Sequence, residues 1–270
     1  MNQPNHYAQQ LRQARLNGTF CDPITEPLSI EQAYEIQNAC TRAAPADESV
    51  VGYKIGATAI ETLGILGLEQ PFYGPLYSSA LNSNDGLKDR LQLPLFTQHK
   101  SRVEAEFVVS MKNDFARGNS DADIIVNDIL DHIDWLAPGL EIVASRFSEV
   151  PEKPGCLAIA DFGANQHMVV GQPFNAWREL DFTSHPVKLE IDNQPDVNGH
   201  SGMSIYGNPL EFVCWLLNQP SMHLQGLQAG QLVSCGTCTG APFIGVGDNI
   251  TADYGDMGRL AVEITTKISD

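Results

Sequence analysis

Two glutamates lie one residue apart in the apolar stretch RVEAEFVVSM at residues 102–111. Side chains alternate between the two faces of a β-strand, so Glu104 and Glu106 would point to the same face. Their Cα atoms would be about 6.5–7 Å apart, close enough for both carboxylates to bind one cation. A strand with one solvated face also explains this spacing. Further acids are therefore needed to favour a cation site.

A third acid, Glu141, stands in the apolar segment GLEIVASRF, which resembles a strand buried on both faces. A buried carboxylate without a partner is costly, so Glu141 requires a positive charge nearby. Arg146 is one candidate, although it would lie on the opposite face of a regular strand. A cation shared with Glu104 and Glu106 is the other. Three carboxylates with open coordination positions suit a hard divalent cation, Mg²⁺ or Mn²⁺.

A lysine occurs in another apolar segment, VVGYKIGAT. Lys54 lies between Gly52 and Gly56, and glycines leave room for a ligand to approach the backbone. Lysine is rare on a buried strand unless it is paired, whereas on an edge strand its ammonium reaches water. Beside a carboxylate-bound metal ion, Lys54 would suit a substrate that carries a carboxylate and an adjacent oxygen.

Charge and composition limit the partners of this chain. It has 270 residues, is 43% hydrophobic and carries a formal net charge of −17. The negative charge argues against binding to nucleic acid or to an anionic membrane surface. The sequence has no 18-residue apolar run and no basic-then-apolar leader, so we expect a cytoplasmic protein. An anionic substrate would need local positive charge at its site.

The six cysteines are mostly dispersed, which is typical of reduced core residues in a cytosolic protein. Cys235 and Cys238 form a C-x-x-C in SCGTCTG. The segment after it is glycine-rich and strand-like, whereas a redox pair should open a helix, and the sequence has no second pair of zinc ligands at suitable spacing. We interpret the motif as small residues in a tight glycine loop.

The arrangement of elements predicts an α+β fold. The first 45 or so residues read as helical, and further helices are predicted at residues 121–136, with Ile125, Ile129 and Ile133 at helical spacing, and at residues 208–219. The rest of the chain consists of short strands without regular alternation with helices, which favours an antiparallel or mixed β body. These strands are predicted at residues 50–58, 103–111, 139–147, 167–174, 186–194, 231–237, 249–255 and 259–268.

The order of the motifs GYKIG, EQPFYGPL, VEAEF, GLEIVASRF, DFGANQHMVVG and GDNITADYGDMGRLAVEI resembles the fumarylacetoacetate hydrolase superfamily. It looks most like the 2-keto-4-pentenoate hydratase / 4-oxalocrotonate decarboxylase branch. The resemblance covers nearly the whole chain. It implies a mixed β-roll catalytic body at residues 49–270, a helical N-terminal region at residues 1–48, a bound divalent metal ion and assembly into a homo-oligomer.

The resemblance also assigns candidate site residues. It implies that Glu104, Glu106 and Glu141 bind the metal ion and that Lys54 is the active-site lysine. Asp85, in NSNDG, falls near the position where the hydratase branch carries an active-site acid.

Two segments expected to lie near the substrate depart from the branch. The branch commonly has Asp-Asn-Ala-Ser-Ser where residues 161–165 of this chain read DFGAN, and its late glycine loop is replaced here by CGTCT. Asp161, Asn165 and Thr237 are the substrate-contact candidates in these segments.

The implied reaction is hydration of a 2-hydroxy-2,4-dienoate. In this hypothesis, the metal ion chelates the substrate carboxylate and 2-oxygen and stabilises charge on that oxygen. Protonation of the far end of the dienol gives a 2-oxo-3-enoate, and water then adds at C4 to yield a 4-hydroxy-2-oxo acid. Lys54 would neutralise the carboxylate or hold the enolate. Asp85 would transfer the proton or orient the water.

Three other functions stay open. Decarboxylation of a 2-oxo-3-enedioate, the 4-oxalocrotonate type, would use the same chelation. Acylpyruvate hydrolysis would require a histidine–acid pair in the N-terminal region, and neither His6 nor His99 lies in a matching motif. The third is a non-catalytic subunit associated with a homologous decarboxylase. Retention of the three glutamates and Lys54 favours an enzyme.

Overall fold

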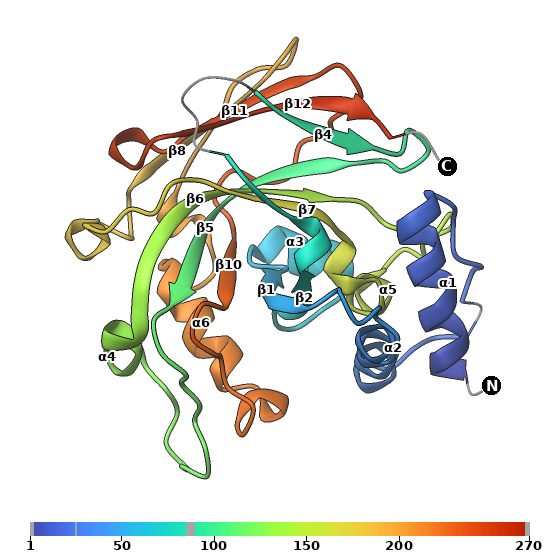
Figure 1. The fold of residues 1–270 in the computed structure, drawn as a ribbon, viewed down its shortest axis with the longest axis horizontal. Helices are drawn as coiled ribbons and strands as arrows, with labels where there is room; N and C mark the ends of the chain where they lie inside the picture. Colours follow the sequence, from blue (N-terminus) through green and yellow to red (C-terminus); the bar gives the residue numbers. More distant parts are fainter. Residues whose placement is uncertain (1–2, 25, 85–89, 268–270) are drawn as a thin grey trace.

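The chain folds into two β-sheets with helices grouped beside and below them (Figure 1). The computed structural model describes residues 3–24, 26–84 and 90–267. The α+β architecture, with helices at the N-terminus and a mixed-sheet body, confirms the fold class predicted from the sequence.

The larger sheet carries the segments singled out in the sequence. Among the described residues it has seven strands in the order β2-β1-β10-β5-β6-β7-β3. Strand β1 runs parallel to β10 and β3 runs parallel to β7, whereas the other neighbours are antiparallel. The strands are β1 (Val50–Gly56), β2 (Phe72–Tyr77), β3 (Leu81–Ser83), β5 (Arg102–Met111), β6 (Ile133–Val143), β7 (Asn165–Val170) and β10 (Leu232–Thr237).

The smaller sheet crosses above the larger one in Figure 1. Its described part has five strands in the order β4-β12-β11-β8-β9, with β4 parallel to β12 and the other neighbours antiparallel. The strands are β4 (Leu91–Leu95), β8 (Pro186–Ile191), β9 (Val197–His200), β11 (Asn249–Asp253) and β12 (Arg259–Thr266). The largest hydrophobic core contains buried side chains from both sheets.

Apart from α3, the helices of the described chain lie in two groups. Helices α1 and α2 pack together, and α2 packs on α5, at the side of the molecule where the chain begins (Figure 1). Helix α6 contacts β10 and α4. No helix in the described part of the chain is long and apolar enough to cross a bilayer. The helices are α1 (Gln3–Asn17), α2 (Ile30–Arg42), α3 (Ile60–Leu66), α4 (Val126–Ile129), α5 (Gly155–Ala160) and α6 (Pro209–Leu217).

The helix predicted at residues 121–136 is wrong for most of its length. One helical turn, α4, and a 3₁₀ turn end at His132, and Ile133 begins β6. Isoleucines at helical spacing suggested one buried face, yet Ile125 is 57% exposed while Ile129 and Ile133 are buried. From Ile133 onward the chain pairs with β5 along almost its whole length, so tertiary pairing prevails over local periodicity.

Strand β5 has the two-faced pattern predicted for it. Val103, Ala105 and Phe107 are fully buried in the core shared with the smaller sheet. Glu104 and Glu106 therefore point to the opposite face of the larger sheet. That face is also apolar farther along the strand, since Val108 packs there with side chains of β2, β7 and β10. The glutamates consequently lie at the edge of a core and not on a solvated surface.

The side chain of Tyr254 connects the smaller sheet to the backbone of the strands that carry these acids. The hydroxyl of Tyr254, which directly follows β11, lies 2.8 Å from the main-chain oxygen of Glu106 and 2.6 Å from that of Gly139. Tyr254 is fully buried, so the two carbonyl groups have no water to replace this donor. The contact fixes the backbone of β5 and β6 next to Glu106.

Substitution of Tyr254 by phenylalanine tests this connection. The change removes the one buried O–H that these two carbonyl groups share, so we expect the free energy of unfolding to fall by roughly 1–3 kcal/mol. Urea unfolding followed by circular dichroism measures the change. The control is Tyr206→Phe at a tyrosine that is 41% exposed, where we expect almost no effect. Equal unfolding midpoints for the two variants would contradict the role of Tyr254.

Candidate metal centre and its cavity

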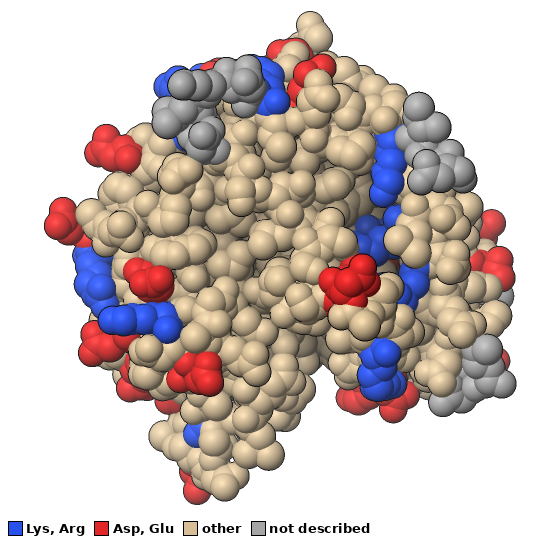
Figure 2. All heavy atoms as spheres, in the orientation of Figure 1, with Lys and Arg blue, Asp and Glu red and all other residues tan. Residues whose placement is uncertain are grey.

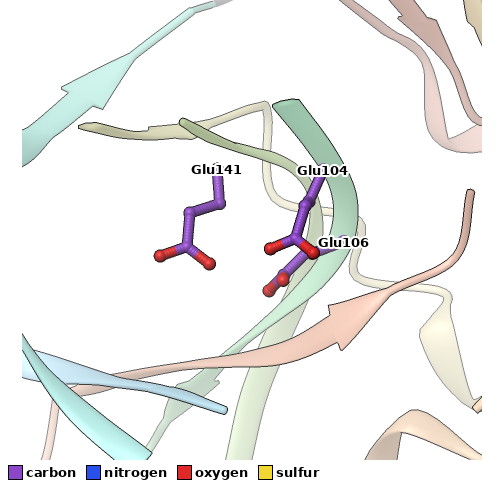
Figure 3. A group of neighbouring side chains, drawn as sticks. All are labelled: Glu104, Glu106 and Glu141. Atoms are coloured by element: carbon purple, nitrogen blue, oxygen red, sulfur yellow. The ribbon is translucent and has the colours of Figure 1, made fainter. Parts of the chain in front are cut away.

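The three glutamates singled out in the sequence come together in the structure. Glu104 and Glu106 project from β5 and Glu141 from β6, with their carboxylates facing a common space (Figure 3). One oxygen of each lies within 4.8 Å of the others. Glu104 and Glu141 are direct cross-strand partners, a placement that destabilises a sheet when both side chains carry the same charge. The group could hold a metal ion.

The hydrogen bonds of the two buried glutamates leave one oxygen of each available. The Oε2 atom of Glu106 accepts bonds from the Ser234 hydroxyl and, at 3.1 Å, from the Gly236 main-chain N–H. The Oε1 atom of Glu141 accepts a bond of 2.9 Å from the side-chain amide of Asn165. Oε1 of Glu106 and Oε2 of Glu141 accept no hydrogen bond from any described residue. The Oε1 atom of Glu106 fits a hard cation as its missing partner. The Oε2 atom of Glu141 is within ion-pair distance of Lys54 and could also bind such a cation.

Lys54 lies in the same group. Its Nζ atom is 3.2 Å from Oε2 of Glu141, an ion-pair distance, although the direction is not that of a regular hydrogen bond. The side chain is 2% exposed, and its ammonium also lies over the ring of Phe72 at 5.4 Å. Lys54 therefore supplies the positive partner that Glu141 was expected to need, and Arg146 does not.

Burial and mutual repulsion shift the acid–base equilibria of this group. Burial raises the pKa of Glu104 to about 7, with the Lys54 charge acting in the opposite direction. Burial, together with the carboxylates of Glu141 and Glu104, raises the pKa of Glu106 well above its usual range. Burial also raises the pKa of Glu141, against the effects of Lys54 and Asn165. Although burial acts to lower the pKa of Lys54, the three carboxylates raise it, so Lys54 is an ammonium at neutral pH.

A cavity of about 440 Å³ opens next to the glutamates. The charged side chains among its described lining residues are Lys54, Glu61, Arg102 and Glu104. Small and apolar side chains from α3, β1 and the segment before β7 form most of the remaining wall. A pocket of this volume is large enough for a small organic substrate. Lys54 and Arg102 are the two positive side chains of this lining, beside the carboxylates of Glu61 and Glu104.

Asp161 lies behind the cavity wall. Its carboxylate accepts the main-chain N–H of Arg146 at 2.7 Å and a guanidinium N–H of the same residue at 3.2 Å. Both side chains are almost fully buried, and burial raises the pKa of Asp161 to about 6, against the effect of Arg146. Asp161 is not among the described residues that line the cavity. Its position is that of a structural ion pair beneath the segment that follows it.

That segment has an unusual backbone. Phe162, Gly163 and Ala164 all adopt left-handed conformations, with φ of 57°, 67° and 59°. Such a conformation costs about 1–3 kcal/mol for a residue other than glycine, and it tends to occur at functional sites. At Gly163 a Cβ atom would lie 2.7 Å from Cδ of Lys54, so the absence of a side chain there leaves space for the lysine side chain. The buried Arg146–Asp161 pair anchors the start of this segment.

The other substrate-contact candidates take different positions. Asn165 is fully buried and holds Glu141, so it reaches the site through that side chain. Thr237 lines the cavity, and its hydroxyl donates to the main-chain oxygen of Gly240 at 2.8 Å. Asp85 lies outside the described residues.

Two residues that hold Glu106, Ser234 and Gly236, were missed in the sequence. Both belong to β10, where the pairing with β5 shifts register between Ser234 and Thr237. A serine in the otherwise apolar run QLVSCGT was the available signal, because a buried hydroxyl requires a hydrogen-bond partner. Gly236 adopts a φ of 86° and donates its N–H to Glu106, and nothing in the sequence indicated this.

Comparison with known proteins places the chain in a family. The family model described as fumarylacetoacetate (FAA) hydrolase C-terminal matches residues 63–265, well over half of the chain. The chain belongs to this family, as the order of its motifs predicted.

Individual relatives are similar along almost their entire length. A 2-keto-4-pentenoate hydratase of Paraburkholderia xenovorans is 28% identical, over 95% of this chain and 93% of the relative. A 4-oxalocrotonate decarboxylase of Pseudomonas putida is 24% identical, over 94% of each chain. A solved 4-oxalocrotonate decarboxylase from Pseudomonas putida, complexed with magnesium and adipate, superposes with a TM-score of 0.83 at 23% identity, over 97% of each chain. At that identity, the last similarity supports the fold alone.

Removal of the Asp161 carboxylate tests its structural role. Asp161→Ala leaves the buried Arg146 guanidinium without its counter-ion, so we expect the free energy of unfolding to fall by about 3–5 kcal/mol. Replacement of both residues, as Arg146→Met with Asp161→Ala, should cost less than the sum of the single changes.

Urea unfolding of the three variants measures these energies. The matched control is Asp131→Ala, which removes a pair with Arg178 on the surface and should change stability by less than about 1 kcal/mol. A cost for Asp161→Ala as small as that of the control would rule out the structural role.

Proposed function

We propose that this member of the fumarylacetoacetate hydrolase family is a hydratase that depends on a divalent metal ion. It adds water to a 2-hydroxy-2,4-dienoate, of the 2-keto-4-pentenoate type, to give a 4-hydroxy-2-oxo acid. The observation that carries the proposal is the convergence of three carboxylates and Lys54 beside one cavity. Similarity to a hydratase along almost the whole chain supports hydration as the reaction.

In this proposal Glu104, Glu106 and Glu141 hold Mg²⁺ or Mn²⁺. The oxygens of Glu106 and Glu141 that accept no hydrogen bond from the described residues are suitable ligands for such an ion. When bound, the ion supplies a Lewis acid that polarises the 2-oxygen of the substrate. Ser234 orients the carboxylate of Glu106 and Asn165 orients that of Glu141, so both ligands are positioned before the ion arrives.

Lys54 acts as a fixed positive charge. The three carboxylates around it raise its pKa, so it is an ammonium at neutral pH in the metal-free protein. Its position at the cavity wall, beside Glu141, allows it to donate hydrogen bonds to the substrate carboxylate or to the enolate oxygen. The contacts with Phe72 and Gly163 restrict its side chain to this direction.

Proton transfer to the far end of the dienol requires a further group. Asp85, outside the described residues, stays our candidate for transferring the proton or orienting the water. Among the described residues, Glu61 and Glu104 are the carboxylates that line the cavity. Glu61 lies in the first turn of α3 and is exposed. Thr237, also at the cavity wall, is proposed to contact the substrate.

Decarboxylation of a 2-oxo-3-enedioate is the second candidate, and Arg102 is the observation in its favour. This arginine lines the cavity two residues before Glu104 and forms no ion pair with a described residue. One of its N–H groups donates to the main-chain oxygen of Ala241, and its guanidinium stacks on Phe243 at 3.7 Å. The remaining N–H groups could bind a second carboxylate, which a decarboxylase substrate carries and a simple dienoate lacks.

An assay with both substrate types decides between the two reactions. Purified protein with Mg²⁺ or Mn²⁺ is supplied separately with 2-hydroxypenta-2,4-dienoate and with 4-oxalocrotonate. We expect loss of the dienol absorbance and formation of the 4-hydroxy-2-oxo acid from the first, abolished by EDTA and restored by metal. Release of CO₂ from the second without hydration of the first would establish decarboxylation. Inertness toward both would refute the enzyme proposal for these substrates.

Replacement of Lys54 separates its role from metal binding. Because Lys54→Met removes the positive charge that meets the substrate but none of the three carboxylates, we expect kcat to fall more than about 100-fold while Mn²⁺ still binds. Steady-state kinetics and calorimetry measure the two effects. The control is Lys112→Met, at an exposed lysine outside the cavity lining. Activity of Lys54→Met within about tenfold of the wild type would exclude the lysine from the mechanism.

Metal affinity should depend on pH. The raised pKa values of the glutamates, about 7 for Glu104, mean that protons compete with the metal ion below neutrality. We expect Mn²⁺ affinity to rise between pH 6 and pH 8, about tenfold per pH unit for each proton displaced, and then to level off.

Calorimetric titrations at several pH values, each in two buffers of different ionisation enthalpy, report both the affinity and the protons released. Glu104→Gln should bind Mn²⁺ more weakly and with a shallower pH dependence. The same affinity at pH 6 and pH 8, without proton release, would count against these ligands.

Assembly and location stay predictions. We propose a homo-oligomer, with association with a homologous decarboxylase as a further possibility, and a cytoplasmic protein. All six cysteines are free in the structure, as expected for a reducing compartment. Residues 1–48 and 49–270 stay the proposed N-terminal region and catalytic body.

A further inference from the structure

A second cavity, separate from the one beside the glutamates, lies between α1 and the sheets. Figure 2 shows Lys and Arg side chains gathered in a furrow on this side of the molecule. The cavity has a volume of about 420 Å³. None of the described residues that line it also lines the cavity next to the glutamates. Its basic side chains are those of Arg12, Arg15, Arg146 and Lys267, with two histidines, His99 and His167.

Two of the arginines are already paired within the protein. Arg12 forms an ion pair with Glu48, and it also donates to the main-chain oxygen of Cys40. Arg146 forms the buried pair with Asp161 described above. Glu48 and Asp161 are therefore already paired with Arg12 and Arg146.

Arg15 differs from both of these arginines. It donates one hydrogen bond of 2.8 Å to the main-chain oxygen of Asn165, and its guanidinium lies 5.5 Å from the ring centroids of Tyr77 and Phe162. No carboxylate of the described chain lies within ion-pair distance of it. Burial and the like charge of Arg146 lower its pKa to about 10, so it is still charged at neutral pH.

Arg15 is half-buried. A guanidinium removed in part from water and without a close counter-ion is unfavourable, and proteins usually pair such groups with an acid or a ligand. The remaining N–H groups of Arg15 make no hydrogen bond with a described residue. Their planar arrangement matches two oxygens of a carboxylate or phosphate group. Arg15 requires an anionic partner, and the cavity that it lines has room for a small one.

We propose that this second cavity binds a small oxyanion whose carboxylate or phosphate oxygens pair with the guanidinium of Arg15. Lys267 adds positive charge to the same lining, whereas Arg12 and Arg146 are paired with Glu48 and Asp161. Asp47 and Glu48 are the acidic residues of the described lining. In a molecule with a net charge of −17, this concentration of cations attracts anions that the rest of the surface repels. The volume admits inorganic phosphate or a short dicarboxylate with room for water. The proposal is independent of the hydratase reaction.

Binding of simple probes tests the proposal. The full-length protein, stripped of metal and free of chelator, is titrated calorimetrically with inorganic phosphate and, separately, with succinate, at constant ionic strength set with chloride. We expect one saturable site per chain with a Kd of about 1 mM or below for at least one probe. The tighter of the two identifies phosphate or carboxylate as the preferred group.

Two variants, each with its own control, locate the site. Arg15→Gln should weaken binding at least about tenfold, whereas Arg42→Gln, an exposed arginine of α2 outside the cavity lining, should leave it unchanged. Because Arg15→Gln could disturb folding, Leu16→Glu serves as a second variant. Leu16 lines the cavity and is 56% exposed, so a carboxylate there should repel the oxyanion without disturbing the core. Leu16→Gln is its neutral control.

Three results would overturn the proposal. The first is the absence of saturable binding by either probe. The second is equal affinity of the wild type, Arg15→Gln and Leu16→Glu. The third is loss of binding in Lys54→Met with retention in Arg15→Gln, which would move the anion to the cavity beside the glutamates.

Discussion

Repulsion among three glutamates on neighbouring strands is the interaction on which the rest of this structure depends. Glu104 faces Glu141 directly across the β5–β6 ladder. Glu106 lies two residues farther along β5, on the same face of the sheet. Water does not reach Glu106 or Glu141, so their charges cannot be screened by solvent. A fold that places acids in this way requires either protons or a cation among them, and a divalent ion removes the repulsion while leaving the carboxylates ionised.

The scaffold holds the acids in place from several sides. Ser234 and Asn165 each occupy one carboxylate oxygen and leave its neighbour available. Tyr254 reaches from the smaller sheet to the backbone of β5 and β6. The strained segment from Phe162 to Ala164 brings Gly163 against Lys54, and a buried ion pair anchors its beginning. The same interactions that position the ligands thus limit how far they can relax away from one another.

The sequence alone predicted the parts of the site that follow from periodicity. Alternation in β5 placed Glu104 and Glu106 on one face, and the apolar run around Glu141 predicted its burial. The loop expected around Cys235 and Cys238 is in part a strand, since Cys235 lies in β10 and Cys238 follows its end. Both thiols are buried and burial raises their pKa values, which does not suit a redox pair. These inferences succeeded because each rests on the immediate neighbours of a residue in the chain.

What the sequence did not predict depends on residues far apart in the chain. The end of a predicted helix is instead part of β6, because this segment pairs with β5, a partner that local spacing does not reveal. The partner of Glu141 proved to be Lys54, 87 positions earlier, and Arg146 pairs with Asp161 instead. Such pairings are set by the sheet order and cannot be read from local spacing.

The central claim is that the three glutamates hold a divalent metal ion and that an α-oxo acid chelates this ion. Titration of the EDTA-stripped protein with Mn²⁺, followed by oxalate as a mimic of such an acid, tests it most directly. The account predicts one Mn²⁺ per chain and oxalate binding that the metal strengthens, even when the Arg15 cavity is disabled by Arg15→Gln. Both should be lost in Glu106→Gln and kept in Glu179→Gln, a surface control. Failure of Mn²⁺ and Mg²⁺ to bind, or oxalate affinity in Arg15→Gln that does not change with metal, would contradict it.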